Sequence, residues 1–196
     1  MPTPTTPAPA PWLTSLRADL EHMVAPRVGS TMHWRVEVAS KIITFPRVRT
    51  AVHYRASSAL ARRGLMPLAC YVQSRAIRNA GCEISPLAEI GPGLCIMHSV
   101  GIVIGHQVRI GRNLRIYQGV TLGDGSRPGQ PTVGDDVLIG AAATVLGGVR
   151  VGDRVVIGAG AVVTIDIPDD MVATGAPATY RPRRDAEMAD LEPFAG

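Results

Sequence analysis

The sequence predicts a mainly β protein, in which a parallel β-helix of about four coils follows an α-helical N-terminal segment. Three observations carry this prediction. Aliphatic residues recur every six positions through the C-terminal half of the 196-residue chain, and a glycine follows many of them. In the N-terminal half the apolar residues recur instead at spacings of three and four, which is typical of helices.

The C-terminal hexapeptides contain two inward series. One runs through Val133, Ile139, Val145, Val151, Ile157 and Val163, and the other, four residues on, through Val137, Ala143, Val149, Val155 and Ala161. A six-residue period fits a short strand followed by a tight turn, three of which close one triangular coil. A single coil cannot bury its own inner face, so neighbouring coils must stack. A β-sandwich would require period-two alternation instead.

The same period occurs upstream with one irregularity. It runs through Ile84, Ile90 and Ile96 and then through Ile104, Ile110, Ile116 and Leu122, so that one step spans eight residues. His98 lies inside this longer step. Most lone histidines in apolar segments are core residues, but a side chain at an irregularity is free to face a cleft. His98 is therefore a candidate functional residue.

The chain divides into four predicted segments. Residues 1–12, rich in Pro, Thr and Ala, are expected to form a disordered tail. Residues 13–80 are expected to form a helical cap, with helices near 13–24, 34–43, 47–63 and 67–80, because Pro46 and Pro67 suit helix starts. The β-helix is expected over 81–167 and a C-terminal extension over 168–196.

Composition narrows the functional classes. Residues 1–80 carry 11 Lys and Arg against 3 Asp and Glu, while the remainder carries 9 against 13. The basic residues are scattered along amphipathic stretches with few aromatics, so we expect no nucleic-acid partner. No apolar run has the length of a membrane span and no export signal is recognisable, which favours a cytoplasmic protein. Three cysteines without CxxC spacing are expected to be reduced and buried.

Three stretches resemble the serine acetyltransferase family of hexapeptide-repeat acyltransferases: CEISPLAEIGPGLCIMHSVGIVIGHQVRIGRNLRIYQGVTLG, IGAAATVLGGVRVGDRVVIGAGAVV and TGAPA. The resemblance covers about residues 45–180. It implies a left-handed β-helix and transfer of an acetyl group from acetyl-CoA to the hydroxyl of L-serine or a serine-like molecule. It implies no metal.

The resemblance also assigns catalytic roles. His98 matches the family's general base, which removes the proton from the attacking hydroxyl. Glu83 matches the acidic residue that orients this histidine, although the family usually has Asp there. Such a pair suits the chemistry, because an alcohol is a poor nucleophile at neutral pH and needs a base whose pKa is near the working pH.

Acetyl-CoA is expected to lie along a groove of the β-helix. The residues that the resemblance places beside it are Gly123, Asp124, Ala141, Ala159 and Arg181. Small side chains at the coil corners let the extended pantetheine arm approach the backbone. The arginine offers charge-assisted hydrogen bonds to phosphate.

The acceptor pocket departs from the family pattern. Met97 replaces an Asp that helps hold the amino acid, and His106 replaces a Glu. The loop that contacts serine is shorter here and offers Gln130, with Arg127 as a candidate partner for a carboxylate. A thioether cannot pair with an ammonium group. Two acceptors therefore remain open: serine itself, or a different hydroxyl- or amine-bearing molecule of specialised metabolism.

The resemblance implies a homotrimer, with a dimer of trimers as the alternative. Two other functional classes share this fold. A metal-dependent hydratase of the γ-carbonic anhydrase type needs three histidines, whereas this β-helix has only His98 and His106. An inactive trimeric scaffold would not need Glu83 and His98 together.

Overall fold

The computed structural model describes residues 12–23 and 34–184, and the side chains from 36 on in the second of these ranges. Four helices come first: α1 (Trp12–Met23), α2 (Trp34–Thr44), α3 (Pro46–Arg62) and α4 (Met66–Ala80). Each starts and ends within one residue of its expected position. α4 ends at Gly81, whose φ of 59° places it in the left-handed region that favours glycine. Except for Trp12, the tail expected over 1–12 lies outside the described residues.

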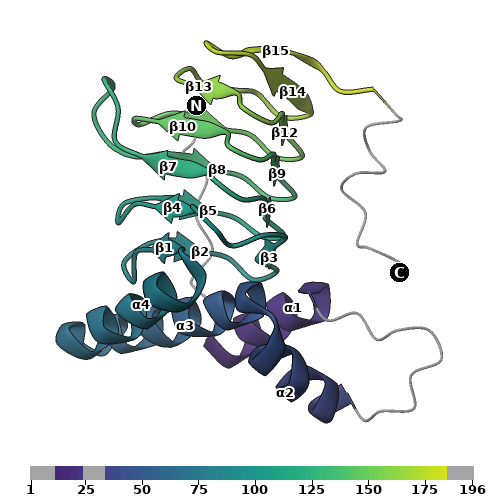
Figure 1. Ribbon diagram of the computed structural model, residues 1–196. Coiled ribbons are helices and arrows are strands. Elements are labelled where there is room, and N and C mark those ends of the chain that lie inside the picture. Colours follow the sequence, from purple (N-terminus) through teal and green to yellow (C-terminus); the bar gives the residue numbers. More distant parts are fainter. Residues whose placement is uncertain (1–11, 24–33, 185–196) are drawn as a thin grey trace.

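Three sheets of short strands follow, stacked on the helices (Figure 1). Sheet 1 contains β1 (Glu83–Ile84), β4 (Val103–Ile104), β7 (Thr121–Gly123), β10 (Thr144–Leu146) and β13 (Val162–Val163). Sheet 2 contains β2 (Glu89–Ile90), β5 (Arg109–Ile110), β8 (Thr132–Val133) and β11 (Arg150–Val151). Sheet 3 contains β3 (Cys95–Ile96), β6 (Arg115–Ile116), β9 (Leu138–Ile139), β12 (Val156–Ile157), β14 (Met171–Thr174) and β15 (Thr179–Pro182).

The chain visits the three sheets in turn, and all neighbouring strands are parallel except β14 and β15. The predicted β-helix is confirmed. Sheet 1 has one strand in each of five coils, one more coil than expected. Strand pairing also continues beyond residue 167, because β14 pairs with β12 inside the segment expected as a C-terminal extension.

The interior of the solenoid is filled by the predicted hexapeptide series. Every member of both series and of the upstream series is buried, and most are fully inaccessible to solvent. In most two-residue strands the second residue points inward and the first outward. Each coil therefore completes the apolar interior of its neighbours, as expected for a solenoid.

A buried ion pair joins the helices to the first coil. Arg55 on α3 donates to Asp19 on α1 through Nε (2.7 Å) and Nη2 (2.9 Å). The same guanidinium donates to the carbonyls of residues 90–91, and the Asp19 carboxylate accepts from the N–H groups of residues 93–94. Because the two charges are paired with each other and hydrogen-bonded to the backbone, the pair is tolerated in the interior.

The cysteines divide into two environments. Cys82 and Cys95 are buried as expected, but Cys70 is exposed on α4, so the expectation was wrong for this residue. Several other apolar residues of α4 are also exposed. The helical period of an amphipathic helix predicts instead that apolar residues face the core. Within the described residues, no helix is long and apolar enough to cross a membrane.

Candidate active site

His98 lies in the turn between β3 and β4, where the six-residue period lengthens to eight. Its side chain is exposed rather than packed in the solenoid. The nearest ring is that of Tyr117 on the next coil, with ring centroids 6.5 Å apart. The longer turn thus removes His98 from the inward series and leaves its imidazole accessible to a ligand.

Glu83 is the first residue of β1 and points outward from sheet 1, opposite Val103 of β4. No hydrogen bond or ion pair joins its carboxylate to His98 in the described part of the chain. Its orienting role stays a prediction.

Burial, followed by the neighbouring Glu83 charge, raises the pKa of the Cys82 thiol to about 12. This cysteine is therefore protonated at neutral pH and is a poor nucleophile.

The turns from sheet 3 into sheet 1 form one edge of the solenoid, which we call the His98 edge (residues 97–102, 117–120, 140–143 and 158–161). Ala141 and Ala159 lie on this edge, and Ala159 is exposed. Backbone hydrogen bonds connect successive turns, including Ala142 N–H to the Gln118 carbonyl and Gly160 N–H to the Ala141 carbonyl, both 2.8 Å. The turns with Ala141 and Ala159 carry small side chains, whereas the turn next to His98 carries Tyr117.

The packing of this edge excludes larger residues. A Cβ placed on Gly140 would lie 2.6 Å from the backbone nitrogen of Ala159. Gly119 lies directly against Ala142, whose φ of 57° is unusual for a residue other than glycine. The small residues of this edge therefore allow successive coils to stack closely.

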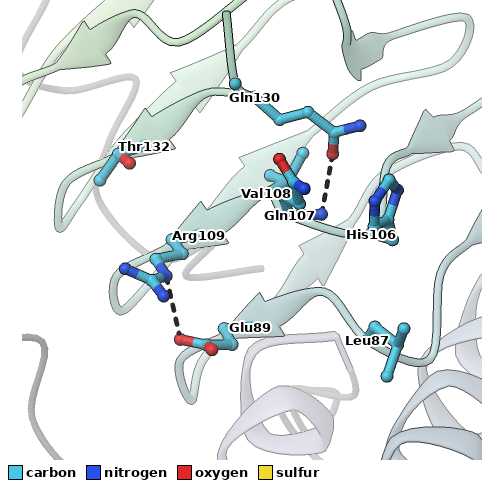
Figure 2. Close-up of a pocket in the computed structure, with 9 residues that line it drawn as sticks. Leu87, Glu89, His106, Gln107, Val108, Arg109, Gln130 and Thr132 are labelled. Atoms are coloured by element: carbon cyan, nitrogen blue, oxygen red, sulfur yellow. Dashed lines mark hydrogen bonds and ion pairs between the residues drawn. The ribbon is translucent and has the colours of Figure 1, made fainter.

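A second edge, formed by the turns from sheet 1 into sheet 2, is called the His106 edge (residues 85–88, 105–108, 124–131 and 147–149). It contains an open pocket of about 470 Å³. Figure 2 shows His106 and Gln130 on its wall. The structure thus brings together two of the four residues expected to bind the acceptor.

Gln130 is held at both ends of its amide. Its Oε1 accepts from the Gln107 N–H at 2.9 Å (Figure 2), and its Nε2 donates to Asp124 Oδ1 at 3.1 Å. The side chain is buried although it lies at the end of a long surface loop. Gln107 could not be predicted from the sequence. It meets Gln130 through its backbone N–H, a group that every residue except proline carries.

The lower part of the pocket carries charges that the sequence did not single out. Glu89 and Arg109, on adjacent strands of sheet 2, form an ion pair at 3.4 Å (Figure 2). Both side chains are more than half exposed. Alternating outward positions on paired strands could have indicated this pair, because Glu89 and Arg109 stand in direct register.

Arg127 does not line this pocket. Its guanidinium makes a two-point ion pair with Asp166, at 2.8 and 3.2 Å, and thereby fastens the loop 124–131 to the turn that follows β13 on a later coil. The Arg150 backbone N–H, and then the Arg127 guanidinium, lower the pKa of the Asp166 carboxyl. In this arrangement Arg127 fixes the loop that contains Gln130.

Met97 is half-buried and packs against the solenoid interior. Its N–H donates to the Ile116 carbonyl at 2.9 Å, and its Sδ lies 3.8 Å from the Cys95 Sγ. The thioether therefore occupies the position directly before His98 as a packed apolar group, which offers no charge to an acceptor.

The remaining expected cofactor residues lie elsewhere. Gly123 ends β7, and Asp124 follows it at the His106 edge, where its carboxylate accepts from Gln130. Arg181 is exposed on β15, and its Nη1 donates to the Pro182 carbonyl at 3.1 Å. Among the described residues, no group of three His, Cys, Asp or Glu side chains is arranged to hold a metal ion.

The two edges lie on opposite sides of sheet 1. His98, Ala141 and Ala159 are on one, and the pocket with His106 and Gln130 is on the other. The predicted site residues of a single chain therefore fall into two separate groups, which we call half-sites.

Comparison with known proteins assigns the fold and the family. Residues 130–164 match the model of the bacterial transferase hexapeptide family (six repeats). The serine acetyltransferase of Helicobacter pylori (strain J99) is 38% identical over 169 residues, which cover 85% of this chain and 96% of that protein. The chain belongs to the serine acetyltransferase family.

Solved structures of serine acetyltransferases agree with this membership. The enzyme of Neisseria gonorrhoeae, in complex with serine, superposes with a TM-score of 0.75 at 31% identity, covering 86% of this chain and 68% of that one. A serine acetyltransferase in complex with CoA superposes with a TM-score of 0.75 at 30% identity, covering 87% of this chain and 69% of that one. The predicted family resemblance is confirmed.

Proposed function

We propose that the chain transfers the acetyl group of acetyl-CoA to the hydroxyl of L-serine, with His98 as general base. Its relatives in the family are serine acetyltransferases, and solved members bind serine and CoA. The observation that carries the proposal is the position of His98. It is exposed at the irregular turn of an otherwise regular solenoid, on the same edge as Ala141 and Ala159.

The proposed reaction needs one proton acceptor. The His98 imidazole removes the proton from the serine hydroxyl as its oxygen attacks the thioester carbonyl carbon. The tetrahedral intermediate collapses with cleavage of the carbon–sulfur bond. The departing CoA sulfur takes the proton from the imidazolium, which leaves O-acetylserine, CoA and neutral His98. Glu83 orients the ring and stabilises the imidazolium.

For the donor, the proposal places the pantetheine arm along the His98 edge beside Ala141 and Ala159. Gly123 and Asp124 lie on the His106 edge, so they suit the opposite wall of a groove between two chains. Arg181 is exposed near the last coil, within reach of phosphate groups at the far end of the groove. Acetyl-CoA is made inside cells, so the proposal includes a cytoplasmic location.

For the acceptor, the proposal uses the pocket of His106 and Gln130 together with Met97. One observation favours a second candidate, a non-serine acceptor. Met97 places a packed thioether beside His98, and Arg127 is engaged by Asp166, so neither supplies a charge to a zwitterion in this structure. A hydroxyl- or amine-bearing molecule that needs no charged partner beside His98 is therefore the second candidate acceptor.

The two half-sites support a homotrimer. The His98 edge of one chain and the His106 edge of the next would meet in a groove if the chains packed around a threefold axis along the solenoid. Each groove would then contain one complete site. Pairing of two trimers through the helical cap is the alternative assembly.

A thiol-release assay with acetyl-CoA tests the proposal. CoA release that saturates with L-serine supports serine as the acceptor. Release with another hydroxyl or amine compound, and none with serine, supports the second candidate. If purified protein releases no CoA with any acceptor and does not bind acetyl-CoA, the acyltransferase proposal is wrong.

A further inference from the structure

We propose that Arg47, in the first turn of α3, is a positioning residue for His98. This inference rests on the proposed function, in which His98 is the general base. The Arg47 Nη1 donates a hydrogen bond of 3.2 Å to the carbonyl of Met97, the residue directly before His98. The helical cap therefore makes a direct contact with the turn that carries the base.

The backbone of His98 is held only through its neighbours. None of the backbone hydrogen bonds of the described residues uses the N–H or the carbonyl of His98. The bonds that anchor the turn lie after His98: the Gly101 N–H donates to the Gly81 carbonyl at 2.8 Å, the Val100 carbonyl accepts from the Gly119 N–H at 2.9 Å, and the Ile102 N–H donates to the Ser99 carbonyl at 3.4 Å. The direction of the imidazole therefore depends on the residues on either side, and above all on the peptide plane between Met97 and His98.

Arg47 restrains that peptide plane through its hydrogen bond to the Met97 carbonyl. The Met97 N–H and Sδ are engaged by Ile116 and Cys95, and these contacts fix the end of β3 and the thioether. Only the guanidinium of Arg47, among the described side chains, bonds to the Met97 carbonyl. Loss of this donor frees the plane that leads into His98.

The local environment does not otherwise favour an arginine at 47. The first turn of α3 contains no acidic residue, and a cation there is opposed by the helix dipole. The Arg47 Nε is buried and has no hydrogen-bond partner within the described ranges. Stacking over the Phe45 ring, at 5.5 Å, is a modest compensation. The contact with the catalytic turn gives this side chain its specific role.

Arg49 provides a matched control. It lies in the same turn of α3, its Nε is also buried and without a partner in the described residues, and its Nη1 donates to a backbone carbonyl. That carbonyl belongs to Ile43 near the end of α2, at 2.8 Å, and not to the His98 turn. The two arginines differ mainly in which carbonyl they hold.

The test compares Arg47→Met and Arg49→Met. In each variant the methionine replaces the unbranched aliphatic stem of the arginine and removes the guanidinium donor. For Arg47→Met we expect kcat to fall about tenfold or more while the KM for acetyl-CoA stays within about twofold, because a small misplacement of a base lowers the rate without weakening the donor complex. Arg49→Met should change kcat by less than about threefold. Arg47→Lys, which retains a donor, should recover part of kcat.

A second readout does not depend on activity. In protein with ¹⁵N-labelled histidine, the imidazole signals of His98 are assigned by their loss in His98→Ala. We expect these signals to shift or broaden in Arg47→Met and to stay unchanged in Arg49→Met. If either variant fails to fold, Arg47→Gln and Arg49→Gln replace the pair, because the amide retains a polar group.

The outcomes separate the two proposals. Equal losses of kcat in both methionine variants, or an unchanged His98 signal in Arg47→Met, would show that Arg47 only stabilises the fold and would overturn the inference. If the wild-type protein releases no CoA with any acceptor, the proposed function fails. The His98 signals then decide the role of Arg47 alone.

Discussion

Gly105 lies directly against the side-chain amide of Gln130, on the coil below the long loop. A Cβ on residue 105 would overlap that amide, whereas the backbone around it has no positive φ that would itself demand glycine. The absence of a side chain at 105 therefore makes the room in which Gln130 turns back toward Gln107 and Asp124.

Substitution of Gly105 by Ala should displace the Gln130 amide rather than unfold the coil, because the end of a glutamine side chain can move. Loss of its two hydrogen bonds should raise the acceptor KM by about tenfold, equivalent to about 1.4 kcal/mol, with little change in the KM for acetyl-CoA. Steady-state kinetics measure both constants. In Gly105→Ala/Gln130→Ala, the effect should be no larger than in Gln130→Ala alone; additive effects would show that Gly105 acts by another route.

Substitution of His98 by Ala should lower kcat by about two orders of magnitude or more, because the attacking hydroxyl loses its general base. The exposed position of His98 means that the solenoid interior is untouched. Thermal unfolding and the mass in solution should therefore match the wild-type protein. Near-normal turnover would remove His98 from the mechanism.

The interior of the β-helix could be predicted residue by residue. Val133 and Ile139 recur at the period of one short strand and one turn, and burial of one member implies burial of the next. His98 could be singled out by the same logic, because it interrupts the period. The helices could be placed from Pro46 and Pro67, since proline fixes the backbone at a helix start.

Contacts between distant segments could not be predicted. The bond from Arg47 to Met97 crosses 50 residues and ends on a carbonyl, which every residue carries. Arg127 was a reasonable candidate for a substrate carboxylate, but the sequence does not show that Asp166 lies within its reach on a later coil. Polar contacts of this kind depend on the packing of coils and not on local pattern.

The ion pair of Arg127 and Asp166 should make the loop sensitive to acid. The pKa of Asp166 is lowered in the folded protein, so its contribution to stability is present above the ordinary aspartate pKa, about 3.9, and is lost as pH falls through the folded-state value. Both side chains are about half exposed, so the contribution should be at most about 1 kcal/mol. Wild-type and Asp166→Asn proteins should differ in Tm at pH 7 and converge in strong acid. An equal difference at all pH values would contradict this account.

Removal of Arg55 should destabilise the protein far more than removal of any exposed arginine. Arg55→Met leaves the Asp19 carboxylate buried without its cation, which typically costs about 3–5 kcal/mol. Urea unfolding measures the loss. Arg112→Met, which breaks an exposed pair with Asp135, is the matched control and should lower the free energy of unfolding far less, because solvent screens an exposed pair. Similar losses in both variants would show that the buried pair has no special role at the junction of α1, α3 and the first coil.

The separation of His98 and Gln130 on two edges predicts complementation between two impaired chains. His98→Ala and Gln130→Ala each damage one half-site, and a groove between two chains is intact only where the His98 edge of a Gln130→Ala chain faces the His106 edge of a His98→Ala chain. In a trimer that contains both kinds of chain, about one groove in three satisfies this condition. Co-expressed variants, purified by two different tags and assayed well below the acceptor KM, should therefore be several times more active than an equal amount of either variant alone. The same variants mixed after separate purification, with no exchange of chains, are the control. Recovery to no more than the sum of the separate activities would place both half-sites of each working centre on one chain, and the trimeric groove would be excluded as the catalytic unit.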